Sequence, residues 1–371
     1  MLRMSLLTGQ QVSNRLMSLD FLRGLIMVLL AFESTGLYEH LYDSTNGSLA
    51  QGWVRQFFHH PWNGLRFWDL VQPSFMFMSG TALAFSLHSQ ELKGIPWKDS
   101  FKKACKRSAW LFFWGVLNYA VHPEGLQLEL SNVLTQLAFT TLIAFLIFRW
   151  SMGAQILFCV FMLLLTESLY RFTHIPGFDQ PFVNQHNFGN YMELKLTGKI
   201  NPEGWVSINW IPTTVHTVAG ALAGKLLLTG KEKIKTLLVW GVICWILGFG
   251  LDFFHITPII KRIGTTSFTL ASLGFCLWFL AIAYGWIDLL GHKKYLRFFL
   301  VVGMNSIFIY LFFEIVGSRW FNGYVGAIVN GLLSIIRVPG AARDIISSLC
   351  IFALEWGLCY FLYRKKIFFK I

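Results

Sequence analysis

The stretch HHPWNGLRFWDLVQPSFMFMSG, residues 59–80, decides how the rest of the chain is interpreted. Its first half carries two histidines, an asparagine and an aspartate, and its second half is almost wholly apolar. Polar groups are costly to place where a helix enters lipid, so they indicate either a tightly packed loop or a function at that boundary. The stretch therefore predicts a membrane helix with a candidate site at its entrance.

The composition of the whole chain is typical of a polytopic membrane protein. Of 371 residues, 55% are apolar types and 13% are charged, which is about half the charged share of a typical soluble domain. The net charge of +12 does not indicate nucleic-acid binding, because the basic residues cluster in the loops between apolar segments. The six cysteines fall mostly inside apolar runs without CxxC spacing, so neither a metal site nor a disulfide framework is predicted.

Ten segments are long enough to cross a bilayer core, which needs about 20 residues. We predict an all-α fold in a single transmembrane domain, residues 1–371, with about ten transmembrane helices near 18–38, 66–88, 105–122, 131–149, 152–171, 206–229, 236–254, 266–289, 297–316 and 344–363. A shorter apolar piece near 320–336 is interrupted by glycine and asparagine. It is predicted to be a re-entrant or interfacial helix on the outer side.

The distribution of lysine and arginine predicts the orientation of the chain. One set of loops and adjoining helix ends holds 21 of the 31 basic residues by count, and this side is expected to be cytoplasmic. Both termini then lie inside, with residues 1–16 as a cytoplasmic arm that does not resemble a cleavable signal. The two longest loops, 39–65 and 172–205, lie on the outer side.

Two polar clusters lie close to predicted helix starts. Asp20 and Arg23 share one helix face, where they form either an ion pair or a basic site for a phosphate ligand. In the second cluster, His59, Asn63 and Asp69 converge within eleven residues, and histidine suits proton transfer near neutral pH. A histidine in such a loop is more often a hydrogen-bonded packing residue, so both interpretations stay open.

Further polar residues lie inside apolar runs, where ionisable groups tend to mark function. Some of these residues will be ordinary hydrogen-bonding partners between helices. The set comprises Glu33, Glu167, Asn209, His216, Asp252, Asn305, Glu314 and Glu355. Lys225 lies near the cytoplasmic boundary, where it either snorkels or meets a phosphate.

Several blocks in order along the chain resemble the membrane domain of the lysosomal heparan-α-glucosaminide N-acetyltransferase family and its bacterial relatives. The blocks are RLMSLDFLRGLIMVLL, the 59–80 stretch, NPEGWVSINW with AGALAGKLLL, GMNSIFIYLFFE and the terminal LYRKKIFFKI. The chain is expected to lack the large luminal domain and first helix of the lysosomal enzyme. The resemblance implies a bacterial-type member in an inner membrane, with a homodimer as one possible assembly.

The resemblance also implies an activity and the residues that perform it. The family transfers acetyl from cytoplasmic acetyl-CoA to the amine of a glucosamine across the membrane, and its active histidine corresponds to His59. An assisting asparagine of the family corresponds to Glu33 or Ser34 here. Asp69 is expected to orient the imidazole and Asn63 to stabilise the oxyanion. Substrate contacts are predicted at Glu33, Ser34, His60, Trp62, Asn209, His216 and Asn305, and CoA contacts at Arg23, Lys225 and Lys106 or Arg107.

Two mechanisms and three other functions stay open at this point. His59 acts either as a base for the amine or as the acceptor of the acetyl group. An amino-sugar transporter fits the polytopic architecture, although no inverted repeat is found in the sequence. An O-acetyltransferase needs the same donor and base. A purely structural membrane protein would not need the polar cluster around His59.

Overall fold

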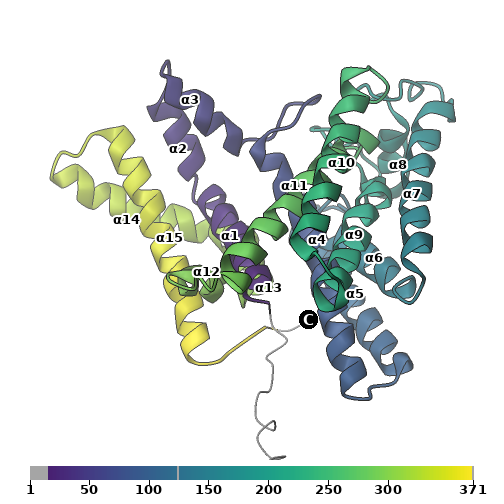
Figure 1. Cartoon of the computed structure of the whole chain (residues 1–371). Helices are drawn as coiled ribbons and strands as arrows, with labels where there is room; N and C mark the ends of the chain where they lie inside the picture. Colours follow the sequence, from purple (N-terminus) through teal and green to yellow (C-terminus); the bar gives the residue numbers. More distant parts are fainter. Residues whose placement is uncertain (1–15, 123–124, 370–371) are drawn as a thin grey trace, which may run out of the picture.

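The computed structural model describes residues 16–122 and 125–369, which fold almost entirely into helices (Figure 1). The predicted cytoplasmic arm lies, except for residue 16, outside the described residues. A hairpin of two short strands, β1 (Val121–His122) and β2 (Gly125–Leu126), adds a small antiparallel sheet. The structure confirms that the protein is a helical membrane protein.

The described residues form fifteen α-helices. They are α1 (Met17–Ser34), α2 (Leu37–Ser44), α3 (Leu49–Val54), α4 (Val71–Leu92), α5 (Trp97–Ala120), α6 (Val133–Leu146), α7 (Met152–Phe172), α8 (Phe188–Thr197), α9 (Trp210–Thr229), α10 (Lys233–Phe253), α11 (Thr266–Ala283), α12 (Leu296–Gly303), α13 (Ser306–Phe312), α14 (Asn322–Ile335) and α15 (Gly340–Arg364). Three 3-10 turns, η1 (Arg55–Phe57), η2 (Phe67–Leu70) and η3 (Ser207–Asn209), and two π-helical segments, η4 (Tyr284–Leu289) and η5 (Phe313–Phe321), extend or connect them.

Six of the described helices are long and apolar enough to cross a membrane, and a bent helix pair makes a seventh if it counts as one span. Only 22% of the apolar stretch of α10 is buried inside the protein, and only 28% of that of α7. Such exposed apolar faces suit contact with lipid. The corresponding stretches around α4 and α9 are 67% and 72% buried, so these helices form the interior.

The count of ten spans is not supported, although each predicted segment is helical. Four predicted spans do not count as straight membrane spans in the structure. Two of them, α1 and α5, carry too many charges: α1 has three charged side chains in 18 residues, and the first half of α5 is rich in lysine. α6 has 14 residues, fewer than a bilayer core needs. The fourth predicted span, near 297–316, lies in a bent helix pair in which Leu296–Gly303 and Ser306–Ile335 meet at 73°.

The break in this last region lies elsewhere than predicted. The sequence predicts a span over 297–316 and a separate helix over 320–336, but the helix is continuous from Ser306 to Ile335. Its middle adopts the π-helical segment η5, and the glycines of the following segment lie within α14 without ending the helix. The chain bends instead after Gly303, whose added Cβ would lie 2.9 Å from the backbone of α1 at Asp20 and Gly24. Close backbone packing therefore places the bend.

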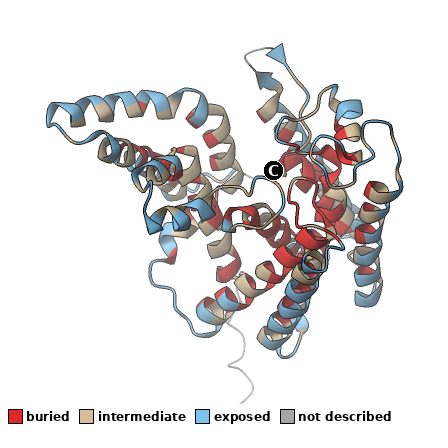
Figure 2. Cartoon of the chain, turned by 90° about the horizontal axis from the view of Figure 1, so that it is seen from above, coloured by how far each residue is buried: buried red, intermediate tan, exposed pale blue. Residues whose placement is uncertain are grey.

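The interior depends on similarly close contacts between α4 and α9. A Cβ on Gly80 would lie 1.8 Å from the carbonyl oxygen of Thr217, and a Cβ on Gly220 would lie 1.9 Å from that of Phe77. Glycine therefore allows the two backbones to touch. Figure 2 shows buried residues concentrated toward the middle of the molecule, with exposed residues toward the periphery. In Figure 1, α1 and α12–α15 lie on one side of α11, and α5–α10 lie on the other.

Candidate active site

The entrance to α4 is organised around the buried carboxylate of Asp69, which is 1% exposed. Its Oδ1 lies 2.9 Å from Nδ1 of His59. Its Oδ2 accepts hydrogen bonds from the backbone N–H groups of His60, at 3.2 Å, and Arg66, at 2.9 Å. The Arg66 guanidinium also donates to the carbonyl of His59 at 2.9 Å. One carboxylate thus fixes both the loop and the imidazole that the loop carries.

A lysine from a distant part of the chain completes this cluster. Lys261 lies in the loop between α10 and α11, and its side chain is 7% exposed. Its Nζ is 3.1 Å from Nδ1 of His59 and 3.7 Å from Oδ1 of Asp69. The two loops are joined by a hydrogen bond from the Gly64 N–H to the Ile259 carbonyl at 2.8 Å. This backbone pairing brings Lys261 to the histidine.

The two contacts of Nδ1 correspond to different tautomers of His59. When Nδ1 carries the proton it donates to Asp69, and Nε2 keeps a lone pair. When Nδ1 accepts from the Lys261 ammonium, the proton lies on Nε2. The first arrangement gives a base or nucleophile, and the second gives a hydrogen-bond donor. The balance between Asp69 and Lys261 therefore sets which chemistry the ring offers.

The surroundings keep the imidazole neutral. Burial and the positive charge of Lys261 lower the pKa of His59 to about 4, although the hydrogen bond with Asp69 acts in the opposite direction. Burial likewise lowers the pKa of Lys261 to about 8, against the attraction of Asp69 and Glu33. Near neutral pH the ring is thus uncharged, while the lysine is largely protonated.

His59 lines a polar cavity of about 970 Å³. Lys261, Trp205 and Glu33 line it near the histidine, and the Trp205 and His59 rings meet edge to face at 5.6 Å between centroids. The cavity follows α4 from Val71 to Ser86, a rise of about 22 Å. Its lining also includes Arg23 from the first turns of α1 and Arg107 from α5. One space therefore connects a half-buried histidine with two arginines.

Two known enzymes are similar to the chain over nearly its whole length. No protein-family model matches the chain. The chain is 24% identical to "Heparan-alpha-glucosaminide N-acetyltransferase" of Mus musculus, over 98% of this chain and 62% of the relative. The enzyme of the same name from Homo sapiens is also 24% identical, over 96% of this chain and 60% of the relative. The chain is a distant relative of these N-acetyltransferases. It spans about three fifths of the length of both relatives.

The structure brings together some of the residues predicted for an acetyltransferase site and separates others. Four of them line the polar cavity, namely Arg23, Glu33, His59 and Arg107. Asp69 lies directly behind His59. Arg23 also pairs with Asp20 at 3.7 Å, which is one of the two interpretations that the sequence left open. Among the described residues, no group of three or more His, Cys, Asp or Glu side chains is arranged to hold a metal ion.

Four other predicted residues near His59 and Glu33 do not line this cavity, namely Ser34, His60, Trp62 and Asn63. The Asn63 side chain is exposed, and its backbone pairs with Ile260. Trp62 donates its indole N–H to the Phe182 carbonyl at 2.8 Å, which ties the two predicted outer loops together. The Ser34 carbonyl accepts from Asn322 at 2.7 Å. Like His60, these residues make contacts that hold the fold around the histidine.

The remaining predicted residues also lie outside the cavity lining. His216 is fully buried, with its Nε2 2.9 Å from the Ser272 hydroxyl. Asn305 holds the C-terminal segment through the Ile367 carbonyl and the Phe369 N–H, both at 3.0 Å. Lys225 donates to the Phe148 carbonyl at 2.5 Å. Asn209 is buried, and Lys106 is exposed on α5.

Lys261 is the main site residue that sequence reasoning missed. It belongs to no motif, and its partners lie about 200 positions away in the chain. One signal was available, because Lys261 and Arg262 are adjacent basic residues in a loop that the charge distribution places on the lysine-poor side. Basic residues that break this pattern are candidates for a specific role.

Proposed function

We propose that the protein is a transmembrane N-acetyltransferase. It moves an acetyl group from cytoplasmic acetyl-CoA to the amine of a glucosamine or a related amino sugar on the outer side of a bacterial inner membrane. The observation that carries this proposal is the polar cavity, because one space is lined both by two arginines and by His59. The distant N-acetyltransferase relatives support the reaction class.

Arg23 and Arg107 are the proposed partners of the CoA phosphates. Guanidinium groups bind phosphate through paired, charge-assisted hydrogen bonds. Between these arginines and the histidine, the lining includes the apolar side chains of Phe75, Met78 and Leu111. Such a wall suits the pantetheine arm better than a sugar. Only the acetyl group then needs to reach the outer side.

His59 is the proposed base for the acceptor amine. With Nδ1–H donated to Asp69, Nε2 takes the proton that the amine loses as its nitrogen attacks the thioester carbonyl. The carbon–sulfur bond breaks, and the proton passes to the departing CoA sulfur. In the alternative route, Nε2 attacks the carbonyl itself and carries the acetyl group to the amine in a second step. The same Asp69 contact supports both routes.

The acceptor and the oxyanion have separate candidate partners. Glu33 lines the cavity and accepts a hydrogen bond from the Trp68 indole at 2.9 Å, which leaves its second oxygen for the ammonium of an amino sugar. The Lys261 ammonium lies beside the imidazole, and we assign it the oxyanion role predicted for Asn63. A donor at this position typically contributes roughly 10²–10³-fold to the rate.

The direct test is acetyl transfer by the purified protein, with labelled acetyl-CoA and glucosamine as substrates. His59→Ala should lower kcat by roughly 10²–10⁴-fold, the usual contribution of a positioned base. His60→Ala is the matched control, because its ring does not line the cavity, and it should retain activity within a few-fold. Thermal unfolding of both variants checks that each one folds. Unaltered turnover in His59→Ala would exclude the catalytic assignment.

The same preparation separates the rival functions. In proteoliposomes, uptake of labelled glucosamine without acetylation would favour a transporter. A product that releases its acetyl group to hydroxylamine would be an ester and would favour an O-acetyltransferase. Acetylated His59 captured after acetyl-CoA alone would select the two-step route over direct transfer.

A further inference from the structure

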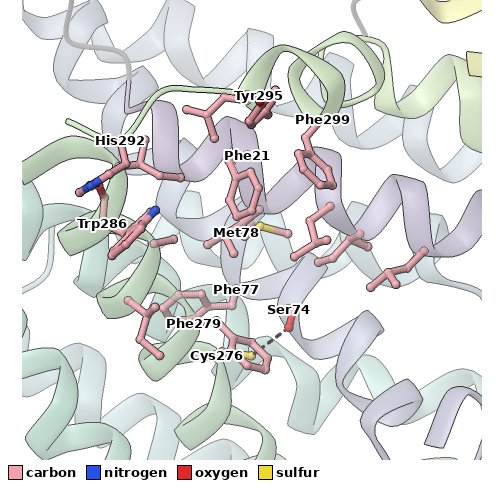
Figure 3. Close-up of a pocket in the computed structure, with 18 of the residues that line it drawn as sticks. Phe21, Ser74, Phe77, Met78, Cys276, Phe279, Trp286, His292, Tyr295 and Phe299 are labelled. Carbon is pink, nitrogen blue, oxygen red and sulfur yellow. Dashed lines mark hydrogen bonds between the residues drawn. The ribbon is translucent and has the colours of Figure 1, made fainter. Parts of the chain in front are cut away.

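A second cavity of about 890 Å³ lies between α1, α4, α11 and the 291–296 segment (Figure 3). Its wall is formed mainly by aromatic and aliphatic side chains, including Phe21, Phe77, Phe279 and Phe299. The hydroxyl of Ser74, one of the few polar groups on the wall, lies 3.6 Å from the sulfur of Cys276. Apolar walls of this kind favour hydrocarbon over a polar solute.

The apolar cavity opens along the outer surface of α11. Three of its lining side chains are largely exposed: Ile282 is 65% exposed, Trp286 is 56% exposed and Tyr295 is 75% exposed. The helix that carries the first two is a candidate membrane span, Thr266–Leu289. In a membrane, an opening on this face meets lipid. A lipid chain can therefore enter the cavity from the side.

One end of the apolar cavity is basic. His292, Lys293 and Lys294 follow one another along its lining, and no carboxylate belongs to the described residues that line it. The nearby Asp288 accepts hydrogen bonds from the backbone N–H groups of Met17 and Ser18, both at 3.1 Å, so its charge is directed to the start of α1. Two lysines beside an apolar space are complementary to the phosphate of an anionic lipid.

The basic rim is held in a defined and partly strained conformation. Trp286 stacks on His292 with 4.0 Å between ring centroids, and the His292 N–H donates to the Trp286 carbonyl at 3.2 Å. Tyr295 has a φ of 65°, a left-handed conformation that is unfavourable for a bulky side chain. The π-helical segment η4 precedes the rim. Both π-segments and strained residues occur often at ligand sites.

We propose that this cavity binds an anionic phospholipid, with an acyl chain between α1 and α11 and the headgroup phosphate against Lys293 and Lys294. The site is separate from the polar cavity and does not depend on the proposed enzymatic function. The bound chain fills the space between α1, α4 and α11. It acts as a structural lipid for this junction.

Native mass spectrometry of the purified full chain tests the proposal with phosphatidylglycerol and phosphatidylcholine of identical acyl chains. The native protein should retain one phosphatidylglycerol, with an affinity roughly thirty-fold higher than its affinity for phosphatidylcholine. This factor follows from the usual contribution of two lysines near an anionic lipid. Lys293→Gln/Lys294→Gln should lose this preference. Lys102→Gln/Lys103→Gln is the matched control, because it removes two consecutive exposed lysines from α5 that line neither cavity.

A second variant tests the acyl-chain part of the site. Ala283→Phe places a ring in the cavity and should weaken retention of both lipids, whereas the lysine variant weakens only that of the anionic lipid. Equal retention of the two lipids by the native protein would overturn the proposal. Displacement of phosphatidylglycerol by acetyl-CoA would also overturn it, because the apolar cavity would then bind the acetyl donor and not a lipid. A dimer that excludes lipid and dissociates in Ala283→Phe would give the cavity to a second copy of the chain.

Discussion

The two cavities have similar volumes and share two helices, yet the lining of one is much richer in polar and charged groups than that of the other. Helix α1 presents Leu22, Ile26 and Leu29 to the apolar cavity, and it presents Arg23 and Glu33 to the polar one. The helical repeat alone separates these faces, because positions three or four apart share a side. The comparison teaches that charges on one face of a buried helix mark a site for polar chemistry. The other face serves packing or lipid.

The largest expected effect comes from Asp69→Asn, which alters the polar cavity and leaves the apolar one intact. The two backbone N–H groups at Oδ2 require an acceptor, so the amide oxygen of the variant turns toward them. Its NH₂ then donates to Nδ1 of His59 and forces the proton onto Nε2. The ring can no longer act as a base. We expect kcat/KM for acetyl transfer to fall on the order of 10⁴-fold, as in other sites with the wrong tautomer.

A stability measurement distinguishes this effect from simple misfolding. Asp69→Asn leaves the buried Lys261 ammonium without its counter-ion, which costs about 3–5 kcal/mol of the free energy of unfolding. The double variant Asp69→Asn/Lys261→Met removes that charge and should regain most of the lost stability without regaining activity. Recovery of activity along with stability would show that Asp69 serves only the fold.

The second prediction asks which of the two basic ends receives the donor. Arg107→Gln removes a charge from the polar cavity, and a charge-assisted hydrogen bond contributes about 1.5–3 kcal/mol. The KM for acetyl-CoA should therefore rise by roughly ten- to a hundred-fold, with little change in kcat. Lys293→Gln/Lys294→Gln, at the end of the apolar cavity, should leave this KM unchanged. If the lysine variant raises KM and Arg107→Gln does not, the roles of the two cavities are reversed.

The helical content of the chain could be predicted from sequence better than the number of spans. Long apolar runs such as those in α7 and α10 give unambiguous spans. Helix α1 is less apolar than a lipid-facing helix because Arg23 and Glu33 line an internal cavity, and α5 is less apolar because its first half carries exposed lysines. The bend after Gly303 depends on contact with α1, which no local pattern records.

Only those residues of the candidate site that lie close together in the sequence could be predicted. His59 and Asp69 lie ten positions apart in one loop, so the sequence was sufficient to propose them as partners. Buried polar residues such as His216 and Asn305 gave the same signal as site residues, but they bind other parts of the fold. Lys261 reaches His59 only through pairing of two distant loops. Its role could be found only from the structure.

The smallest predicted effect is a shift in the pH profile of acetyl transfer in Lys261→Met, in addition to the overall loss of rate expected from removing the proposed oxyanion donor. His59 faces Asp69, Lys261 and the more distant charge of Arg262. Activity requires the neutral imidazole, so it falls as pH drops through the pKa of His59, which is about 4 in the native protein. Lys261→Met removes a positive charge and lets this pKa rise toward its ordinary value near 6.5. The acid limb of the profile therefore moves to higher pH.

At pH 5 the native imidazole is mostly neutral, whereas an imidazole with the ordinary pKa is about 3% neutral. Relative to its activity at pH 8, Lys261→Met should thus lose up to about thirty-fold at pH 5. Lys261→Arg keeps the charge and should retain the native acid limb. The profile of kcat/KM for the three proteins, measured with a buffered series from pH 4.5 to 8.5, reads out the difference. An acid limb that stays in place in Lys261→Met would mean that burial, not the neighbouring ammonium, keeps His59 neutral.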